Sequence, residues 1–328
     1  NMSESNKRNF IVHGSILAIA GILVRIIGML YRIPVVNIIG SEGNGIYGAA
    51  FNIYNIMLVL SSYGLPMAVS KLVSARFTKR RYKSAAKVFR CSLMVAVCTG
   101  GIAALLVFFG ASFIENVIYG GGLPGLAIPL RILAPTIFLV AILGVIRGFF
   151  QGQSTMIPTA VSQILEQIVN AIVSIAAGYG MMKAFASSPD VAAYGAAGST
   201  LGTAMGALTA VLFMGFLYAV YTPTFNRLKR KDRHTENQST GQICKIIIYT
   251  MIPIILGQTF YQISALIDDV MFSNIMVGRD ITKSISMDLG NFSSSYSLLI
   301  GIPQGVASAM SASMLPSVVA SFTEIGRA

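Results

Sequence analysis

Two arginines within a long apolar stretch near the N-terminus have the right chemistry to bind a phosphate inside a membrane. Arg25 lies at the centre of this stretch and Arg32 follows seven residues later, so about two helical turns place both on one face. A charge at mid-membrane costs about 2.5–3.5 kcal/mol on insertion scales and therefore needs a cavity, a partner or a function. Arginine suits phosphate because its planar fork donates two hydrogen bonds at once. We predict that Arg25 and Arg32 line a phosphate-binding cavity; the alternative is that Arg32 extends to the interface and Arg25 pairs with a carboxylate such as Glu166.

A stripe of polar residues runs along the apolar segment 157–182. Its members are three, four, seven and eleven residues from the first, which places them on one helical face: Gln163, Glu166, Gln167, Asn170 and Ser174. Such a face is costly to expose to lipid, where polar groups find no partners. It either lines an aqueous cavity or holds two helices together. The ionisable Glu166 favours the cavity.

Three carboxylates are candidates for coupling transport to a cation. One is Glu166, and the others are Asp268 and Asp269 at the end of the apolar segment 244–271. The aspartates could bind a cation or a proton, or could simply lie at the outer membrane interface, which the pattern slightly favours.

Few residues could form a metal or catalytic site. The histidines are His13 and His234, and the cysteines Cys91, Cys98 and Cys244 fit neither a disulfide framework nor a zinc-ligand spacing. The sequence also contains no recognisable nucleophile–base pair and no phosphate-binding glycine loop. We expect no metal, no cofactor and no catalysis.

The composition predicts that these residues are positioned by transmembrane helices. Hydrophobic residues make up 54% of the 328 residues, and charged residues only 11%, whereas soluble domains carry about 25% charged residues. A membrane span needs about 20 mostly apolar residues. Eight segments meet this length: 10–36, 47–70, 88–111, 126–149, 157–182, 196–221, 244–271 and 292–320. The predicted fold is therefore all-α, a polytopic bundle of transmembrane helices whose first span is not a cleaved signal peptide.

The distribution of Lys and Arg predicts the orientation of the bundle. Basic residues gather at the N-terminus, in 71–90 and in 227–245, whereas the alternating connections 37–46, 112–125 and 183–195 contain only Lys183. The positive-inside rule places the basic connections and the N-terminus in the cytoplasm. The net charge of +12 does not indicate a nucleic-acid partner, because the basic residues lie in short loops without interleaved aromatic residues.

The spans divide into two groups. Residues 1–221 form a six-helix lobe, 222–243 a basic cytoplasmic linker, and 244–328 the first spans of a second lobe that is cut short. Tandem six-helix halves are common in transporters. Within the first lobe, the spacing of Gly198, Gly202 and Gly206 predicts close packing between two helices.

Three segments carry a resemblance to a known family. They are Arg25–Pro34 with the following 40–48, Tyr63–Val73, and Arg147–Val169, which begins Arg-Gly-Phe-Phe-Gln-Gly and contains Glu166. Together they resemble the polysaccharide-transporter branch of the multidrug/oligosaccharidyl-lipid/polysaccharide exporter superfamily, and within it the stage V sporulation protein B group and the similar lipid II flippases of peptidoglycan synthesis.

The resemblance implies two six-helix lobes around a cationic cavity that opens alternately to either side of the bacterial cytoplasmic membrane. The cargo would be a lipid-linked oligosaccharide, with its pyrophosphate on Arg25 and Arg32, its sugars along the polar stripe and its lipid tail in the bilayer. An H⁺ or Na⁺ gradient or the membrane potential would drive transport. The protein would act as a monomer. The family's arginines are spaced slightly closer, so Arg32 matches less well than Arg25.

Two other functions remain open at this point. A multidrug/cation antiporter of the same superfamily would have an acidic, aromatic-lined cavity, and Arg25 counts against it. A non-transporting membrane scaffold for sporulation or cell-wall enzymes would tolerate the loss of Arg25, whereas a flippase would not.

Overall fold

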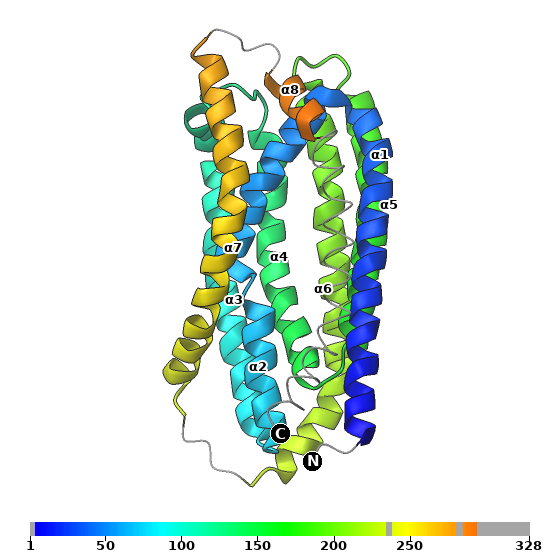
Figure 1. The fold of residues 1–328 in the computed structure, drawn as a ribbon, viewed down its shortest axis with the longest axis vertical. Coiled ribbons are helices and arrows are strands. Elements are labelled where there is room, and N and C mark those ends of the chain that lie inside the picture. Colours follow the sequence, from blue (N-terminus) through cyan, green and yellow to red (C-terminus); the bar gives the residue numbers. More distant parts are fainter. Residues whose placement is uncertain (1–3, 234–237, 280–284, 294–328) are drawn as a thin grey trace, which may run out of the picture.

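The computed structural model describes residues 4–233, 238–279 and 285–293 of the chain. Within these residues every regular element is a helix, and the helices form an elongated bundle (Figure 1). Six helical segments are long and apolar enough to cross a membrane. The predicted fold class is confirmed, while the eighth predicted span, 292–320, lies outside the described residues apart from its first two positions.

Helix α1 (Glu4–Ser62) contains both of the first two predicted spans. Its helical geometry is interrupted at Gly40, where φ is 71° and ψ is 177°, a left-handed region that glycine enters at little cost. The first arm of α1 ascends to this bend and the second arm returns across the bundle (Figure 1). After a break at Gly64, α2 (Leu65–Thr78) continues the descent, with Pro66 in its first turn, where the missing amide hydrogen costs nothing.

The remaining spans agree with the predicted segments but extend beyond them. They are α3 (Tyr82–Phe113), which ends in the π-helical turn η1 (Ile114–Ile118), then α4 (Ala127–Gly152), α5 (Ile157–Ala184), α6 (Val191–Lys231) and α7 (Thr240–Val277). Helix α6 runs to Lys231, so the first part of the predicted linker 222–243 is helical. A helix can continue into water because its backbone hydrogen bonds are internal, whereas apolar length alone marks only the part in the membrane.

The connections that carry the basic residues lie at one end of the bundle. The α2–α3 turn and the end of α6 are both at the bottom of Figure 1, and the η1–α4 connection, the α5–α6 connection and the short helix α8 (Ile285–Phe292) are at the top. We call the former the basic end and the latter the opposite end. This alternation is the pattern on which the predicted orientation rests.

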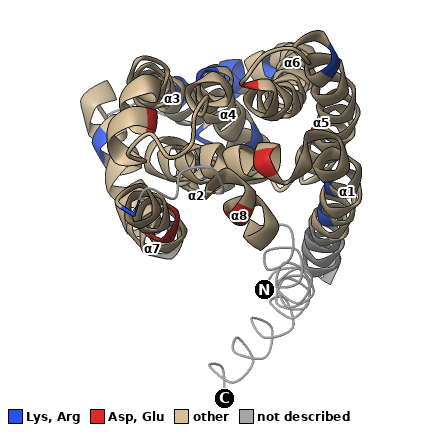
Figure 2. Cartoon of the chain, turned by 90° about the horizontal axis from the view of Figure 1, so that it is seen from above, with Lys and Arg blue, Asp and Glu red and all other residues tan. Residues whose placement is uncertain are grey.

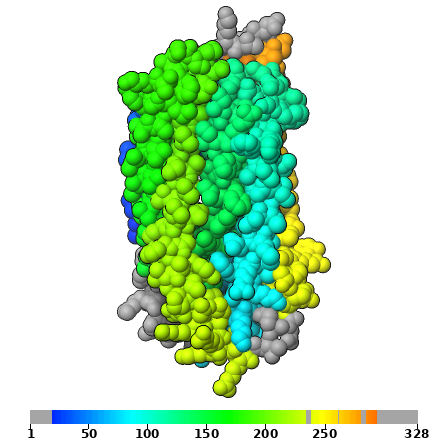
Figure 3. Space-filling view, turned by 180° about the vertical axis from the view of Figure 1, so that it is seen from behind, coloured from blue at the N-terminus to red at the C-terminus, as the bar shows by residue number. Residues whose placement is uncertain are grey.

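Helices α5 and α6 approach closely because glycines line their contact. A Cβ atom at Gly206 would lie 2.6 Å from the carbonyl oxygen of Glu166, and one at Gly202 would overlap the hydroxyl of Ser174. At Gly198 an added Cβ would overlap the Ala177 carbonyl. The predicted glycine packing is confirmed, and Figure 3 shows α6 between α5 and the α3–α4 pair along most of the bundle.

Helix α7 packs against α1, α2 and α3. Its buried residues Ile243, Ile247 and Met251 join an apolar cluster near the basic end that is built around Phe149. Further along the helix, Leu266 packs against a second cluster, at the opposite end of the bundle. The described part of the chain is therefore held together along its whole length by two apolar cores.

The α5–α6 contact predicts that alanine will be costly at one glycine of α6 and tolerated at another. Replacing Gly202 with Ala should lower the thermal stability of the detergent-solubilised protein by about 1–3 kcal/mol, because the added methyl group overpacks the contact with Ser174. Gly215 is the control, since a Cβ there would have no neighbour within 4 Å, and Gly215→Ala should be neutral or slightly stabilising. Equal melting temperatures for the two variants would contradict this packing.

Candidate functional site

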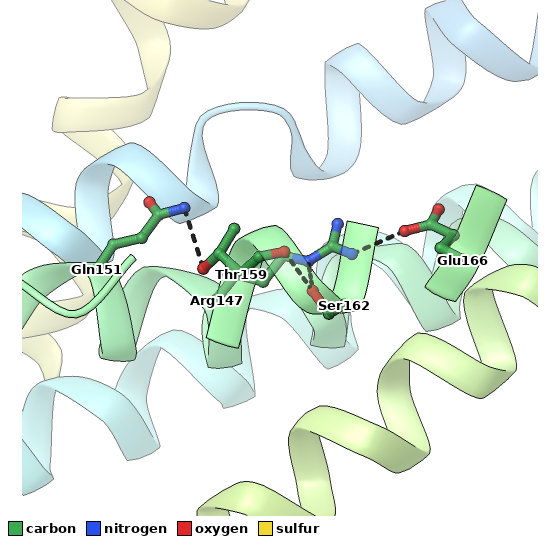
Figure 4. Close-up of polar contacts among 5 residues, drawn as sticks. All are labelled: Arg147, Gln151, Thr159, Ser162 and Glu166. Carbon is green, nitrogen blue, oxygen red and sulfur yellow. Dashed lines mark hydrogen bonds and ion pairs between the residues drawn. The ribbon is translucent and has the colours of Figure 1, made fainter. Parts of the chain in front are cut away.

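An ion pair joins α4 and α5 near the basic end. Arg147 Nη2 lies 2.8 Å from Glu166 Oε2, and the two side chains are 14% and 21% exposed. Arg147 Nε also donates to Ser162 Oγ at 2.9 Å, and Ser162 donates to the carbonyl of Thr159 (Figure 4). Two nitrogens of the guanidinium, Nε and Nη2, are thus bonded to residues of α5, which fixes its orientation.

The partner of Glu166 is not Arg25, which was the alternative considered from the sequence. The carboxylate is bound by Arg147 of α4 and is not the counter-ion that Arg25 would require. Sequence reasoning used Arg147 only as part of a family motif and missed it as a site residue. The available signal was a cation near the end of the predicted span 126–149 and a carboxylate on the next predicted span, although the sequence does not show that the two face each other.

The upper part of the polar stripe bonds helix to helix. Asn170 is 6% exposed and its Nδ2 donates to the hydroxyl of Tyr31 on α1 at 3.2 Å. The hydroxyl of Ser174, fully buried, lies 2.9 Å from Asn170 Oδ1 and 2.8 Å from the carbonyl oxygen of Ser199 on α6. These polar groups therefore satisfy one another across three helices, as the alternative of a helix contact requires.

The lower part of the stripe keeps polar surface available. Gln163 and Gln167 are partly exposed, like Glu166 between them. In the described part of the chain, no hydrogen bond occupies either amide. If an aqueous cavity lies beside this part of α5, two amides and one carboxylate would line it.

The two arginines of α1 differ in their surroundings. Arg25 is exposed, and Arg32 is partly buried with its guanidinium carbon 5.9 Å from the ring centroid of Tyr47. Arg32 Nη2 also lies 3.4 Å from the hydroxyl of Ser293, directly after α8. Because Tyr31 is the neighbour of Arg32 and bonds Asn170, the structure connects the arginine arm of α1 to the polar stripe of α5.

Of the two aspartates near the end of α7, one contacts the bundle. Asp269 is partly buried and accepts a hydrogen bond from Asn52 of α1 at 2.6 Å, whereas Asp268 is exposed. Sequence reasoning missed Asn52, because its pairing with α7 depends on a contact between residues 217 positions apart. Asp269 therefore bridges α7 to the second arm of α1.

A family model described as "Polysaccharide biosynthesis protein" matches residues 11–322. The chain belongs to this family. Among curated proteins of Bacillus subtilis (strain 168), it is 28% identical over 315 residues to "Lipid II flippase MurJ", covering 94% of this chain and 57% of that protein. It is 25% identical over 316 residues to "Stage V sporulation protein B", covering 95% of this chain and 58% of that protein. This family member thus spans a little over half the length of these relatives.

Solved structures show the same fold for this family member. A crystal structure titled as MATE in complex with MaD3S has a TM-score of 0.64 at 17% identity, covering 94% of this chain and 66% of that one. An outward-facing multidrug resistance MATE family transporter of the MOP superfamily has a TM-score of 0.62 at 16% identity, with 94% and 66% covered. The resemblance to the polysaccharide-transporter branch of that superfamily is confirmed.

The ion pair predicts a strong coupling between α4 and α5. Glu166→Gln should leave Arg147 partly buried without its counter-charge and destabilise the protein by about 1–3 kcal/mol, less than the 3–5 typical of a fully buried pair because both side chains keep some water contact. Adding Arg147→Gln should recover much of this loss. Thermal unfolding of the two single variants and the double variant forms the cycle that measures the coupling; strictly additive losses would mean that the pair contributes nothing.

Proposed function

We propose that the protein is a flippase for an undecaprenyl-pyrophosphate-linked saccharide, such as lipid II or a related polysaccharide precursor. The observation that carries this proposal is the pair of arginines on one face of a membrane helix, in a chain that is 28% identical to a protein named as a lipid II flippase. A pyrophosphate is a dense anion, and two guanidinium groups are its natural partners in a site shielded from water.

The phosphate groups would bind along the first arm of α1. Arg32 is held by the Tyr47 ring and by Ser293, so its guanidinium is already oriented, and Arg25 is exposed two turns nearer the basic end. The sugars would lie against Gln163, Glu166 and Gln167, whose surface is partly open. The buried Asn170 would act from behind this surface, by fixing α5 to Tyr31.

The protein would lie in the bacterial cytoplasmic membrane with its N-terminus and basic end in the cytoplasm, as the positive-inside rule indicates. Residues 1–221 would form one lobe, and 244–328 would begin the second lobe, joined by the basic linker 222–243. Rocking of the lobes would open the site to each side in turn, within a monomer.

A cation gradient or the membrane potential would supply the energy, with H⁺ or Na⁺ as the coupling ion. The candidate residues are Glu166, Asp268 and Asp269. Of these, Asp269 lies where α7, the first helix of the second lobe, meets α1, so a change in its charge would act directly on the contact between lobes.

A multidrug antiporter is the second candidate, favoured by the likeness of the fold to MATE transporters. An organic cation would be repelled by Arg25 and Arg32, and Glu166, the carboxylate of the polar stripe, is already paired with Arg147. A scaffold without transport activity is the third candidate and makes no use of these charges. The polar chemistry on α1 and α5 supports the flippase over both.

The arginine site predicts a loss of function in cells. The full-length protein, expressed in bacteria depleted of their own lipid II flippase, should restore the lipid II that is accessible to a lipid II-hydrolysing enzyme added outside the cell. Arg25→Ala should reduce this signal at least tenfold, because a charged hydrogen-bond partner of the phosphate is lost.

The matched control is Arg131→Ala, which removes an exposed arginine that bonds Ser112 at the opposite end of the bundle. It should transport normally. If the unaltered protein restores nothing despite good expression, lipid II is the wrong cargo; if Arg25→Ala transports normally, the arginine site is wrong.

A further inference from the structure

A cavity opens between α1 and α5 at the opposite end of the bundle. Its volume is about 530 Å³, and it is lined by Asn37 and Ile38 of α1 and by Tyr179, Met182 and Lys183 of α5. The two helices lie side by side at one edge of the bundle in both Figure 1 and Figure 2. The cavity therefore lies between two neighbouring membrane-spanning helices, apart from Arg25 and the lower polar stripe.

The polar groups in this cavity are suited to an anion. Lys183 contributes an ammonium group, Tyr179 a hydroxyl and Asn37 an amide, and none of the five lining residues is acidic. Ammonium and hydroxyl donors of this kind bind phosphate oxygens through charge-assisted hydrogen bonds. The volume also lies within the range of about 300–1,000 Å³ that small ligands occupy.

Lys183 is exceptional for its position in the chain. The first three connections at this end of the bundle, 37–46, 112–125 and 183–195, contain no other Lys or Arg. A cation in the last turn of α5 interacts favourably with the helix dipole. That interaction explains a positive charge at this point, but it does not explain why the charge lies in a cavity with two further donors.

Apolar surface extends from the cavity toward the basic end on both helices. On α1, Leu30 and Leu23 precede Asn37 by seven and fourteen residues, which places them on its face, and they are 62% and 44% exposed. On α5, Ile172 and Ile168 precede Tyr179 by seven and eleven residues, on its face, and are 63% and 41% exposed. At 1.5 Å per residue, each apolar row is about 15–21 Å long, comparable with one leaflet of the hydrocarbon core.

We propose that this cavity binds the phosphate of a membrane lipid. The phosphate lies between Lys183, Tyr179 and Asn37, and the hydrocarbon chain lies along Leu30 and Ile172 toward the membrane centre. Two lipids share this chemistry, a bulk phospholipid such as phosphatidylglycerol and a prenyl carrier such as undecaprenyl phosphate. The site is separate from the proposed transport pathway, and its occupation does not require that the protein be a flippase.

The test measures lipid binding by the purified, delipidated full-length protein with native mass spectrometry. Three lipids are compared: phosphatidylglycerol, undecaprenyl phosphate, and a diacylglycerol that has no phosphate. The unaltered protein should bind at least one phosphate lipid about tenfold more tightly than diacylglycerol. A tenfold preference for undecaprenyl phosphate over phosphatidylglycerol identifies the prenyl carrier, and equal or reversed affinities identify bulk phospholipid.

Lys183→Gln should reduce the affinity for the phosphate lipid about tenfold, while Lys71→Gln, which removes an exposed lysine of α2 near the basic end, should not. Tyr179→Phe removes a single hydroxyl and should lower the affinity severalfold, so it serves as a milder variant should Lys183→Gln fail to fold. Equal binding of diacylglycerol and both phosphate lipids, or unchanged phosphate binding in folded Lys183→Gln and Tyr179→Phe, would overturn the proposal. None of these outcomes depends on transport, so the result is separable from the test with Arg25→Ala.

Discussion

Polar side chains inside a membrane have no water to bond, and the arrangement of α1, α4, α5 and α6 follows from that constraint. The polar stripe of α5 would be costly on a helix that faced lipid. Instead, Ser174 and Asn170 bond to α6 and to Tyr31 of α1, and Glu166 bonds to Arg147 of α4. A single helix thus directs its polar face to three neighbours, and the orientation of α5 about its own axis is fixed by these bonds.

The glycines of α6 make this arrangement possible. Hydrogen bonds from short side chains such as Ser174 reach a neighbouring backbone only when the two helix axes are close. At Gly202 and Gly206 any larger residue would occupy the space that Ser174 and the Glu166 backbone now fill. The glycines of α6 and the polar side chains of α5 therefore belong to one helix contact, and each depends on the other.

Much of the fold, but less of the site, could be predicted from the sequence. Apolar length identified the described spans, and the spacing of Gly198, Gly202 and Gly206 identified a real helix contact, because both are local properties of one segment. The bend at Gly40 was not distinguished from a loop between spans, since glycine-rich sequence is compatible with both. The partners of Glu166 and Asp269 could not be predicted, because they depend on how one helix is rotated against another.

Glu166 and Asp269 differ in how easily a coupling cation could displace the group that each carboxylate now contacts. At Glu166, a cation would have to displace a guanidinium that Ser162 holds on its other side, and the displaced charge would then need a new partner. At Asp269, the competing group is the neutral amide of Asn52, which could turn its own carbonyl oxygen toward a cation. Displacing a neutral dipole from a carboxylate costs less than separating an ion pair away from water. We therefore propose that coupling in such a transport cycle would fall on Asp269, with Glu166 remaining the counter-ion of Arg147 between α4 and α5.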